Sequence, residues 1–191
     1  MINIIEKTLE ESVTAKKAAI KENNQRLIET ARLMAQSLTA GGKILIFGNG
    51  GSAADAQHIA AEFVNRFQTE RVPLASIALT TDSSIITSIG NDYSFEEIFS
   101  KQVTALGRKN DVAIGISTSG NSPNVVKALK AAEKKGVHTV AFTGKGGRAA
   151  DMAEIALTVP IGNTARIQES HILMGHILCD LVDRILFPEN F

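Results

Sequence analysis

The sequence contains a single cysteine, no tryptophan and no excess of charge of either sign. Cys179 alone excludes an internal disulfide and any zinc site built on several cysteines, which is typical of a reducing compartment. Twenty basic residues balance twenty acidic ones, so no basic field is available to neutralise a nucleic acid or an anionic membrane. No apolar run approaches the ~18 residues of a membrane-spanning helix, and no signal-peptide pattern follows Met1. We therefore expect a cytoplasmic protein that binds neither nucleic acid nor membrane.

The remaining composition is that of one ordinary globular domain. The chain has 191 residues, of which 44% are hydrophobic and 21% are charged. Chains of this size bury a sizeable core without disulfides or metals. We expect a single domain over residues 1–191, in which residues 1–40 form N-terminal helices for packing or oligomerisation. Residues 41–191 are expected to form an α/β core that ends in a C-terminal helix.

Residues 3–39 carry apolar side chains at helical spacing. The polar run Glu22-Asn23-Asn24 interrupts the good helix formers, so we predict two helices with a break near Asn23. Four apolar residues stand seven positions apart and form a seam that could pack on a partner helix or on the chain's own core. The seam consists of Val13, Ile20, Leu27 and Met34.

From Gly41 onward, short apolar runs alternate with helical stretches, which predicts a doubly wound, flavodoxin-like α/β fold with a parallel five-stranded sheet. Ligands bind such sheets at the carboxyl ends of the strands. The expected strands are Ile44–Phe47, Leu74–Leu79, Val112–Ile116, Val137–Phe142 and Ile155–Val159, and the expected helices are Ser52–Phe67, Phe95–Leu106, Pro123–Lys135 and Thr164–Phe187. The last helix is apolar on most of its circumference, so its polar residues Gln168, His171 and His176 each need a partner or a ligand.

A glycine-rich loop, Gly48-Asn49-Gly50-Gly51-Ser52, joins the first strand to a helix. Such a loop lets the backbone approach a ligand, and the helix start favours an anionic or hydroxyl-rich group. Its match to the dinucleotide fingerprint G-x-G-x-x-G/A is weak, because the expected acidic residue about twenty positions on is missing and Asp82 lies too far along the chain. The interpretation as a dinucleotide-dependent oxidoreductase therefore depends on this weak fingerprint alone.

A second loop repeats the strand-to-helix design and carries the hydroxyls of Ser117, Thr118, Ser119 and Ser122. Hydroxyls, backbone N–H groups and a helix start that converge on one point can hold a phosphomonoester without Arg or Lys. The alternative is a capped helix start, with Ser122 as the N-cap and Pro123 as the first helical residue.

His58 and Glu62 lie four residues apart on the helix that leaves the first loop, so their side chains share one face. Such a pair is more often a surface pair than a metal site. Its position beside the glycine-rich loop, and the polar residues on the last helix, favour a metal here.

Together these motifs resemble the phosphoheptose isomerases of the sugar-isomerase (SIS) fold. The resemblance runs in order through nearly the whole chain, on Gly48–His58, Glu62, Thr80–Asp82, Gly90–Tyr93, Ser117–Ser122 and Ala165–Glu169. It implies an aldose-ketose isomerase that converts sedoheptulose 7-phosphate to D-glycero-D-manno-heptose 7-phosphate through a metal-assisted enediol, for ADP-heptose and lipopolysaccharide biosynthesis. It also implies a homo-oligomer, typically a tetramer.

The resemblance also assigns residues. It implies a metal site of His58, Glu62, Gln168 and His176 that holds one zinc or another divalent ion, with Glu62 and His176 as the catalytic groups. Substrate contacts are implied for Glu62, Gln168, Asn49, Gly50, Gly51, Asn91 and Asp92, with the phosphate on Ser117, Thr118, Ser119 and Ser122. Ser52 joins the substrate-binding set because of its place in the first loop.

A non-catalytic SIS-fold protein, such as a phosphosugar sensor or the homologue that associates with a replication initiator, is the main alternative. Those relatives lack a carboxylate at the position of Glu62, so the isomerase is favoured. Gln168 and His176 stand eight residues apart, about 12 Å along one helix. This separation predicts that a second subunit donates one of the two metal ligands.

Overall fold

The computed structural model describes residues 1–191 and confirms the predicted parallel sheet. Five strands run in the order β2-β1-β3-β4-β5, and every neighbouring pair is parallel. This is a doubly wound order: β2 is added on one side of β1, and β3, β4 and β5 are added on the other side. The order of the strands therefore reverses between β1 and β3. The strands are β1 (Ile44–Gly48), β2 (Ser76–Ala78), β3 (Val112–Ser117), β4 (His138–Thr143) and β5 (Ile155–Thr158).

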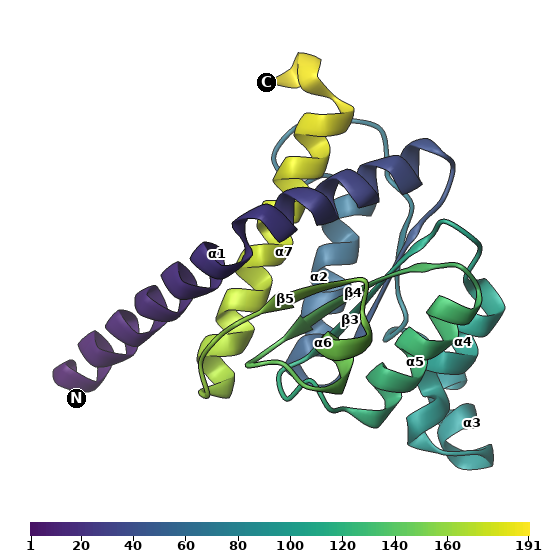
Figure 1. Cartoon of the computed structure of the whole chain (residues 1–191), viewed down its shortest axis with the longest axis horizontal. Coiled ribbons are helices and arrows are strands. Elements are labelled where there is room, and N and C mark those ends of the chain that lie inside the picture. Colours follow the sequence, from purple (N-terminus) through teal and green to yellow (C-terminus); the bar gives the residue numbers. More distant parts are fainter.

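Helices cover both faces of the sheet (Figure 1). Successive strand residues point to opposite faces, so Ile44 and Ile46 belong to one core while Leu45 and Phe47 belong to the other. The first core is covered by α1 (Ile2–Thr39), α2 (Gly51–Val64) and α7 (Thr164–Leu186), and the second by α4 (Ile98–Leu106), α5 (Pro123–Lys134) and α6 (Arg148–Met152).

The first helix is continuous, so the predicted break near Asn23 is wrong. The Asn23 side chain is fully buried and binds the edge strand β5: its Nδ2 donates to the carbonyl of Thr158 (2.7 Å), and its Oδ1 accepts from the Thr158 N–H (3.0 Å). A poor helix former is kept in the helix because its amide completes the sheet edge, which would otherwise be left unpaired.

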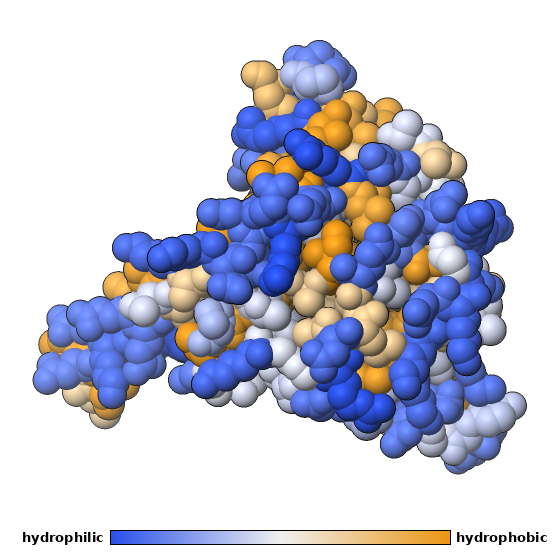
Figure 2. All heavy atoms as spheres, in the orientation of Figure 1, coloured by the Kyte–Doolittle hydropathy of each residue, from blue (hydrophilic) through white to orange (hydrophobic).

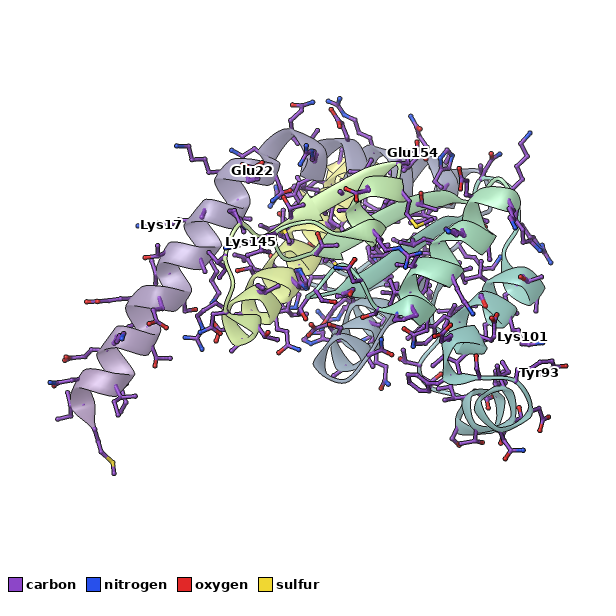
Figure 3. The ribbon with its side chains drawn as sticks, turned by 60° about the horizontal axis from the view of Figure 1, so that its bottom comes forward. Lys17, Glu22, Tyr93, Lys101, Lys145 and Glu154 are labelled. Carbon is purple, nitrogen blue, oxygen red and sulfur yellow. The ribbon has the colours of Figure 1, made fainter.

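The heptad seam divides into two halves. Leu27 and Met34 are buried against the chain's own core, where α1 packs along α7, whereas Val13 is 41% exposed. From Val13 toward the N-terminus, α1 extends away from the body of the molecule, as Figures 1 and 3 show. Apolar side chains remain exposed on this projecting half, among polar ones (Figure 2): Ile2, Ile4, Ile5 and Leu9 are 64–70% exposed.

Two helices lie outside the sequence-based expectations. α3 (Ser83–Asp92) packs only Ile86 and Ile89, partly buried, on the second core, and α6 buries only Ala149 in five residues, so both are short helices with little buried surface. The predicted 95–106 helix divides into a 3₁₀ turn, η1 (Phe95–Glu97), and α4; a second such turn, η2 (Pro188–Asn190), follows α7. No helix combines the length and the apolar character that a membrane span requires.

Candidate active site

The two predicted ligand loops lie side by side at the carboxyl edge of the sheet. β1 and β3 are neighbours, with Gly48 opposite Ile116, and their loops lead to α2 on one face and α5 on the other. Two hydrogen bonds join the first loop to the start of α5, from Asn49 to Asn124 (2.9 Å) and back (2.8 Å). The loops meet at the point where strand order reverses, which is where ligands bind in such sheets.

The first loop depends on glycine at two positions. Gly50 has φ +55°, in the left-handed region that side chains rarely adopt. At Gly51 a Cβ would lie 2.5 Å from the Gln168 amide nitrogen, so a side chain there would displace the end of the Gln168 side chain. Asn49 is half-buried at the loop's edge, while Ser52 is only 3% exposed beneath it.

In the second loop three of the four predicted hydroxyls converge, those of Ser117, Ser119 and Ser122, and Thr118 makes no contact with them. Ser117 Oγ lies 2.9 Å from Ser122 Oγ and 3.4 Å from Ser119 Oγ, and the Asn121 N–H donates to Ser119 Oγ (3.1 Å). Ser122 occupies the N-cap position of α5, but its side chain makes no capping hydrogen bond there. The simple capped-helix alternative therefore lacks its expected hydrogen bond, and the anion site stays a prediction.

His58, Glu62 and His176 form a compact group between α2 and α7. His58 Nε2 lies 3.0 Å from Glu62 Oε1 and 3.2 Å from His176 Nε2, and the ligand atoms of all three lie within 4.8 Å of one another. The helices approach closely because position 175 is glycine: a Cβ there would lie 2.6 Å from Ile59 Cδ1. All three side chains come from one chain.

This donor set fits a zinc ion. Tetrahedral ligands with bonds of about 2.0–2.1 Å stand about 3.3 Å apart, close to the two distances measured from His58 Nε2. Two imidazole nitrogens that face each other across 3.2 Å share a bond well only when one carries a hydrogen and the other a lone pair. A cation between them satisfies both lone pairs and the carboxylate, and two imidazoles with one carboxylate are a common zinc set.

Burial tunes two groups in this region. Partial burial, and next the nearby His58, lower the pKa of His176, against the opposing effect of Glu62. The imidazole is therefore held in its neutral form, which can bind a metal or accept a proton. Burial raises the pKa of Asp55, three residues before His58, and one of its carboxylate oxygens is buried without a hydrogen-bond partner.

Asp55 was not among the predicted site residues, although its i, i+3 spacing from His58 on the same helix is a usable sequence signal. Other predicted residues make no hydrogen bond to the three-residue group. Gln168 packs against Gly51 at the start of α2. His176 lies beside His58, which stands about two turns beyond Gly51 on α2. Asn91 and Asp92 are exposed at the end of α3, and their side chains bond to each other (2.9 Å).

Comparisons with known proteins agree with this arrangement. The SIS domain family matches residues 9–144. The chain is 55% identical over 184 residues to the phosphoheptose isomerase of Thermodesulfovibrio yellowstonii, covering 96% of this chain and 92% of that protein. It is 52% identical to the phosphoheptose isomerase of Aquifex aeolicus, over 97% of this chain and 98% of the relative.

Structural similarity is equally extensive. The phosphoheptose isomerase structure from Neisseria gonorrhoeae superposes with a TM-score of 0.89 at 50% identity, covering 95% of this chain and 97% of that one. The identity is high over almost the whole length, and the fold is shared. These similarities argue against the dinucleotide-dependent oxidoreductase. The chain therefore belongs to the SIS domain family and, within it, to the phosphoheptose isomerases, and it is a phosphosugar isomerase.

Proposed function

We propose that the enzyme converts sedoheptulose 7-phosphate to D-glycero-D-manno-heptose 7-phosphate in the cytoplasm, supplying ADP-heptose for lipopolysaccharide biosynthesis. The observation that carries this proposal is a hydroxyl-lined loop at the start of α5 that lies beside the glycine-rich loop from which α2 leads to the His58–Glu62–His176 group. His58 stands seven residues beyond Gly51, about 10 Å along α2 from the glycine-rich loop. The proposed phosphate loop and the proposed proton-transfer groups are therefore separated, as a sugar whose phosphate is several carbons away from its carbonyl requires.

Glu62 is the group suited to carry the proton. Ketose-to-aldose conversion moves a proton between C1 and C2 through an enediol, and a carboxylate beside those carbons can take the proton from one and return it to the other. Neutral His176 serves the sugar oxygens, accepting and returning the hydroxyl proton as the carbonyl changes place. Positioned acid–base groups of this kind contribute typically ~10²–10⁴-fold to the rate.

A zinc ion fits the proposal. His58, Glu62 and His176 would hold it, with Gln168 as the fourth ligand that the family resemblance implies. When bound, a divalent ion of this kind supplies Lewis-acid polarisation of a carbonyl and stabilises developing negative charge on oxygen. The non-catalytic alternative is disfavoured, because this chain carries the Glu62 carboxylate that such proteins lack and its relatives are phosphoheptose isomerases.

The substrate's phosphate is proposed to bind at Ser117, Thr118, Ser119 and Ser122. The N–H groups and positive dipole end of α5 add to these hydroxyls. The sugar hydroxyls would then meet Asn49, Gly50 and Gly51 of the adjoining loop. Asn91 and Asp92, implied by the family resemblance, would approach from the end of α3.

We infer that the enzyme is a homo-oligomer, and specifically a tetramer, as the family resemblance implies. The projecting half of α1 exposes a row of large apolar side chains that no part of the chain covers, and such surfaces are usually buried in closed symmetric assemblies. Because His58, Glu62 and His176 already converge within one chain, the expectation of a ligand from a second subunit now concerns Gln168.

Incubation of the zinc-loaded protein with sedoheptulose 7-phosphate, followed by detection of an aldose phosphate, tests the proposal. Conversion is expected, and it should be lost in Glu62→Gln. Fructose 6-phosphate serves as the control ketose phosphate. A protein that binds zinc but isomerises no heptulose phosphate would contradict the substrate assignment.

A further inference from the structure

Arg71 and Asp183 form a buried ion pair close to the active site. Arg71 lies in the segment after α2, and Asp183 lies on α7, the helix that carries His176. Their side chains are 1% and 2% exposed, and Arg71 Nε donates to Asp183 Oδ1 at 3.0 Å. Burial this complete is rare for charged side chains unless they are paired, as these two are.

The remaining donors of Arg71 are directed mainly at the end of α2, with one further bond from Nη1 to the carbonyl of Val72 (3.2 Å). Its Nη2 donates to the carbonyl of Glu62 (2.8 Å), and its Nη1 donates to the carbonyls of Phe63 (2.7 Å) and Asn65 (3.0 Å). Carbonyls in the last turn of a helix have no intrahelical partner, and a cation there also meets the negative end of the helix dipole. One guanidinium therefore closes the last turn of α2 and ties it to α7.

The tied turn is the one that carries the proposed base. Glu62 stands two residues before the end of α2, and the guanidinium bonds to the backbone of Glu62 itself. On α7, Asp183 lies seven residues beyond His176, which is about two turns along the same helix. The pair thus links the backbone of one catalytic residue to the helix of the other.

We propose that the Arg71–Asp183 pair is a positioning device that holds the Glu62 carboxylate in place against His58 and His176. This inference rests on the proposed function, and it concerns placement: neither side chain touches substrate. If it holds, loss of the guanidinium fork frees the last turn of α2 and spreads the metal-binding atoms, in addition to any loss of stability. A misplacement of about 1 Å in an active site can cost ~10²-fold in rate.

A second ion pair, with a buried carboxylate, provides a control. Lys43 Nζ lies 2.6 Å from Asp111 Oδ2; the Asp111 side chain is 1% exposed and the Lys43 side chain is 18% exposed. These residues precede β1 and β3, at the edge of the sheet opposite the active site. Lys43→Met therefore removes the cation beside a buried carboxylate, as Arg71→Met does, but far from Glu62.

The experiment compares Arg71→Met, Arg71→Lys and Lys43→Met with the wild type. Measured are thermal unfolding, zinc affinity of the metal-free protein, and kcat and KM on sedoheptulose 7-phosphate. Both Met variants should lose stability. Only Arg71→Met should bind zinc about tenfold more weakly, in line with the 10–100-fold effects of groups that orient metal ligands. Its kcat should fall at least tenfold, while its KM stays within about threefold.

Arg71→Lys separates charge from geometry. Lysine keeps the pairing with Asp183 but lacks the planar fork that reaches several carbonyls at once. We expect it to recover much of the stability and little of kcat. Wild-type zinc affinity and kcat in both Arg71 variants would overturn the positioning role and leave a purely structural pair.

If Arg71→Met does not fold, Arg71→Lys and Asp183→Asn give the same test. If the wild type isomerises no heptulose phosphate, the proposed function fails, but the zinc titration still decides the positioning role. A wild type that also binds no zinc overturns both.

Discussion

Glu62 and Glu133 are both helical glutamates, but only Glu62 faces two imidazole rings, whereas Glu133 is exposed on α5. Glu62→Gln keeps the shape of the side chain and removes its basicity. We expect kcat to fall at least ~10²-fold with the thermal unfolding temperature nearly unchanged, as for loss of a general base. Glu133→Gln should leave both quantities unaltered. Near-normal turnover in Glu62→Gln would remove this residue from the proton-transfer step.

The hydroxyl of Ser119 belongs to the proposed phosphate site, remote from the reacting carbons. Ser119→Ala should therefore raise KM more than it lowers kcat, because the phosphate contributes mainly uniform binding to ground and transition states. Steady-state kinetics on the phosphosugar measures the two effects separately. The exposed Ser84 on α3 provides the control, Ser84→Ala. An unchanged KM would return the loop to a simple helix start.

His171 is buried on α7, where its Nε2 contacts the carbonyl of Thr143 (3.0 Å), and burial lowers its pKa to about 4. The unfolded chain takes up a proton on this residue near pH 6.5, whereas the folded chain stays neutral down to about pH 4. Unfolded protein thus binds more protons in this window, and stability falls as the pH is lowered through it. Between pH 8 and pH 5 we expect a loss of roughly 2 kcal/mol from this residue.

Urea unfolding at both pH values measures this loss. His171→Gln, which keeps a hydrogen-bond donor but does not titrate, should be less pH-dependent. Equal slopes in the two proteins would rule out His171 as the source.

At the scale of elements, the buried side chain of Asn23 joins α1 to the edge of the sheet, and the exposed Arg26 adds a longer hydrogen bond to the carbonyl of Ala156 (3.4 Å). Asn23→Ala leaves the N–H and carbonyl of Thr158 without their partner on the covered edge of β5. Unsatisfied buried groups of this kind cost about 1–3 kcal/mol each, so we expect a stability loss of that order or slightly more. The exposed neighbour Asn24 gives the control, Asn24→Ala, and chemical unfolding compares the two. Equal stability in both variants would show that the Asn23 bonds contribute little.

At the scale of the whole molecule, the projecting half of α1 is the surface expected to bring subunits together. Leu9→Glu places a charge on a residue that is 64% exposed in the single chain and should dissociate the oligomer. Sedimentation velocity measures this, with Glu10→Gln on the same helix as the control. A wild type that sediments as a monomer would contradict the assembly.

The five strands, the longer helices between them and the two ligand loops follow from the sequence, because they depend on local patterns, whereas the short helices α3 and α6 do not. β-branched runs, glycines after strands and the i, i+4 spacing of His58 and Glu62 are properties of short segments. The family motifs add residue roles, but Gln168, Asn91 and Asp92 make no hydrogen bond with the three-residue group. Their roles stay predictions.

Tertiary structure alone decided the contacts between distant segments. Asn23 looks like a helix breaker until Thr158, 135 residues away, supplies its partners. The contact between His58 and His176 requires α2 and α7 to meet at Gly175. The role of Arg71 cannot be inferred until the fold brings it beside Asp183. Local propensities differ by at most about 1 kcal/mol for ordinary residues, whereas a buried polar group without a partner costs more. Where the two conflict, as at Asn23, the long-range partner determines the structure.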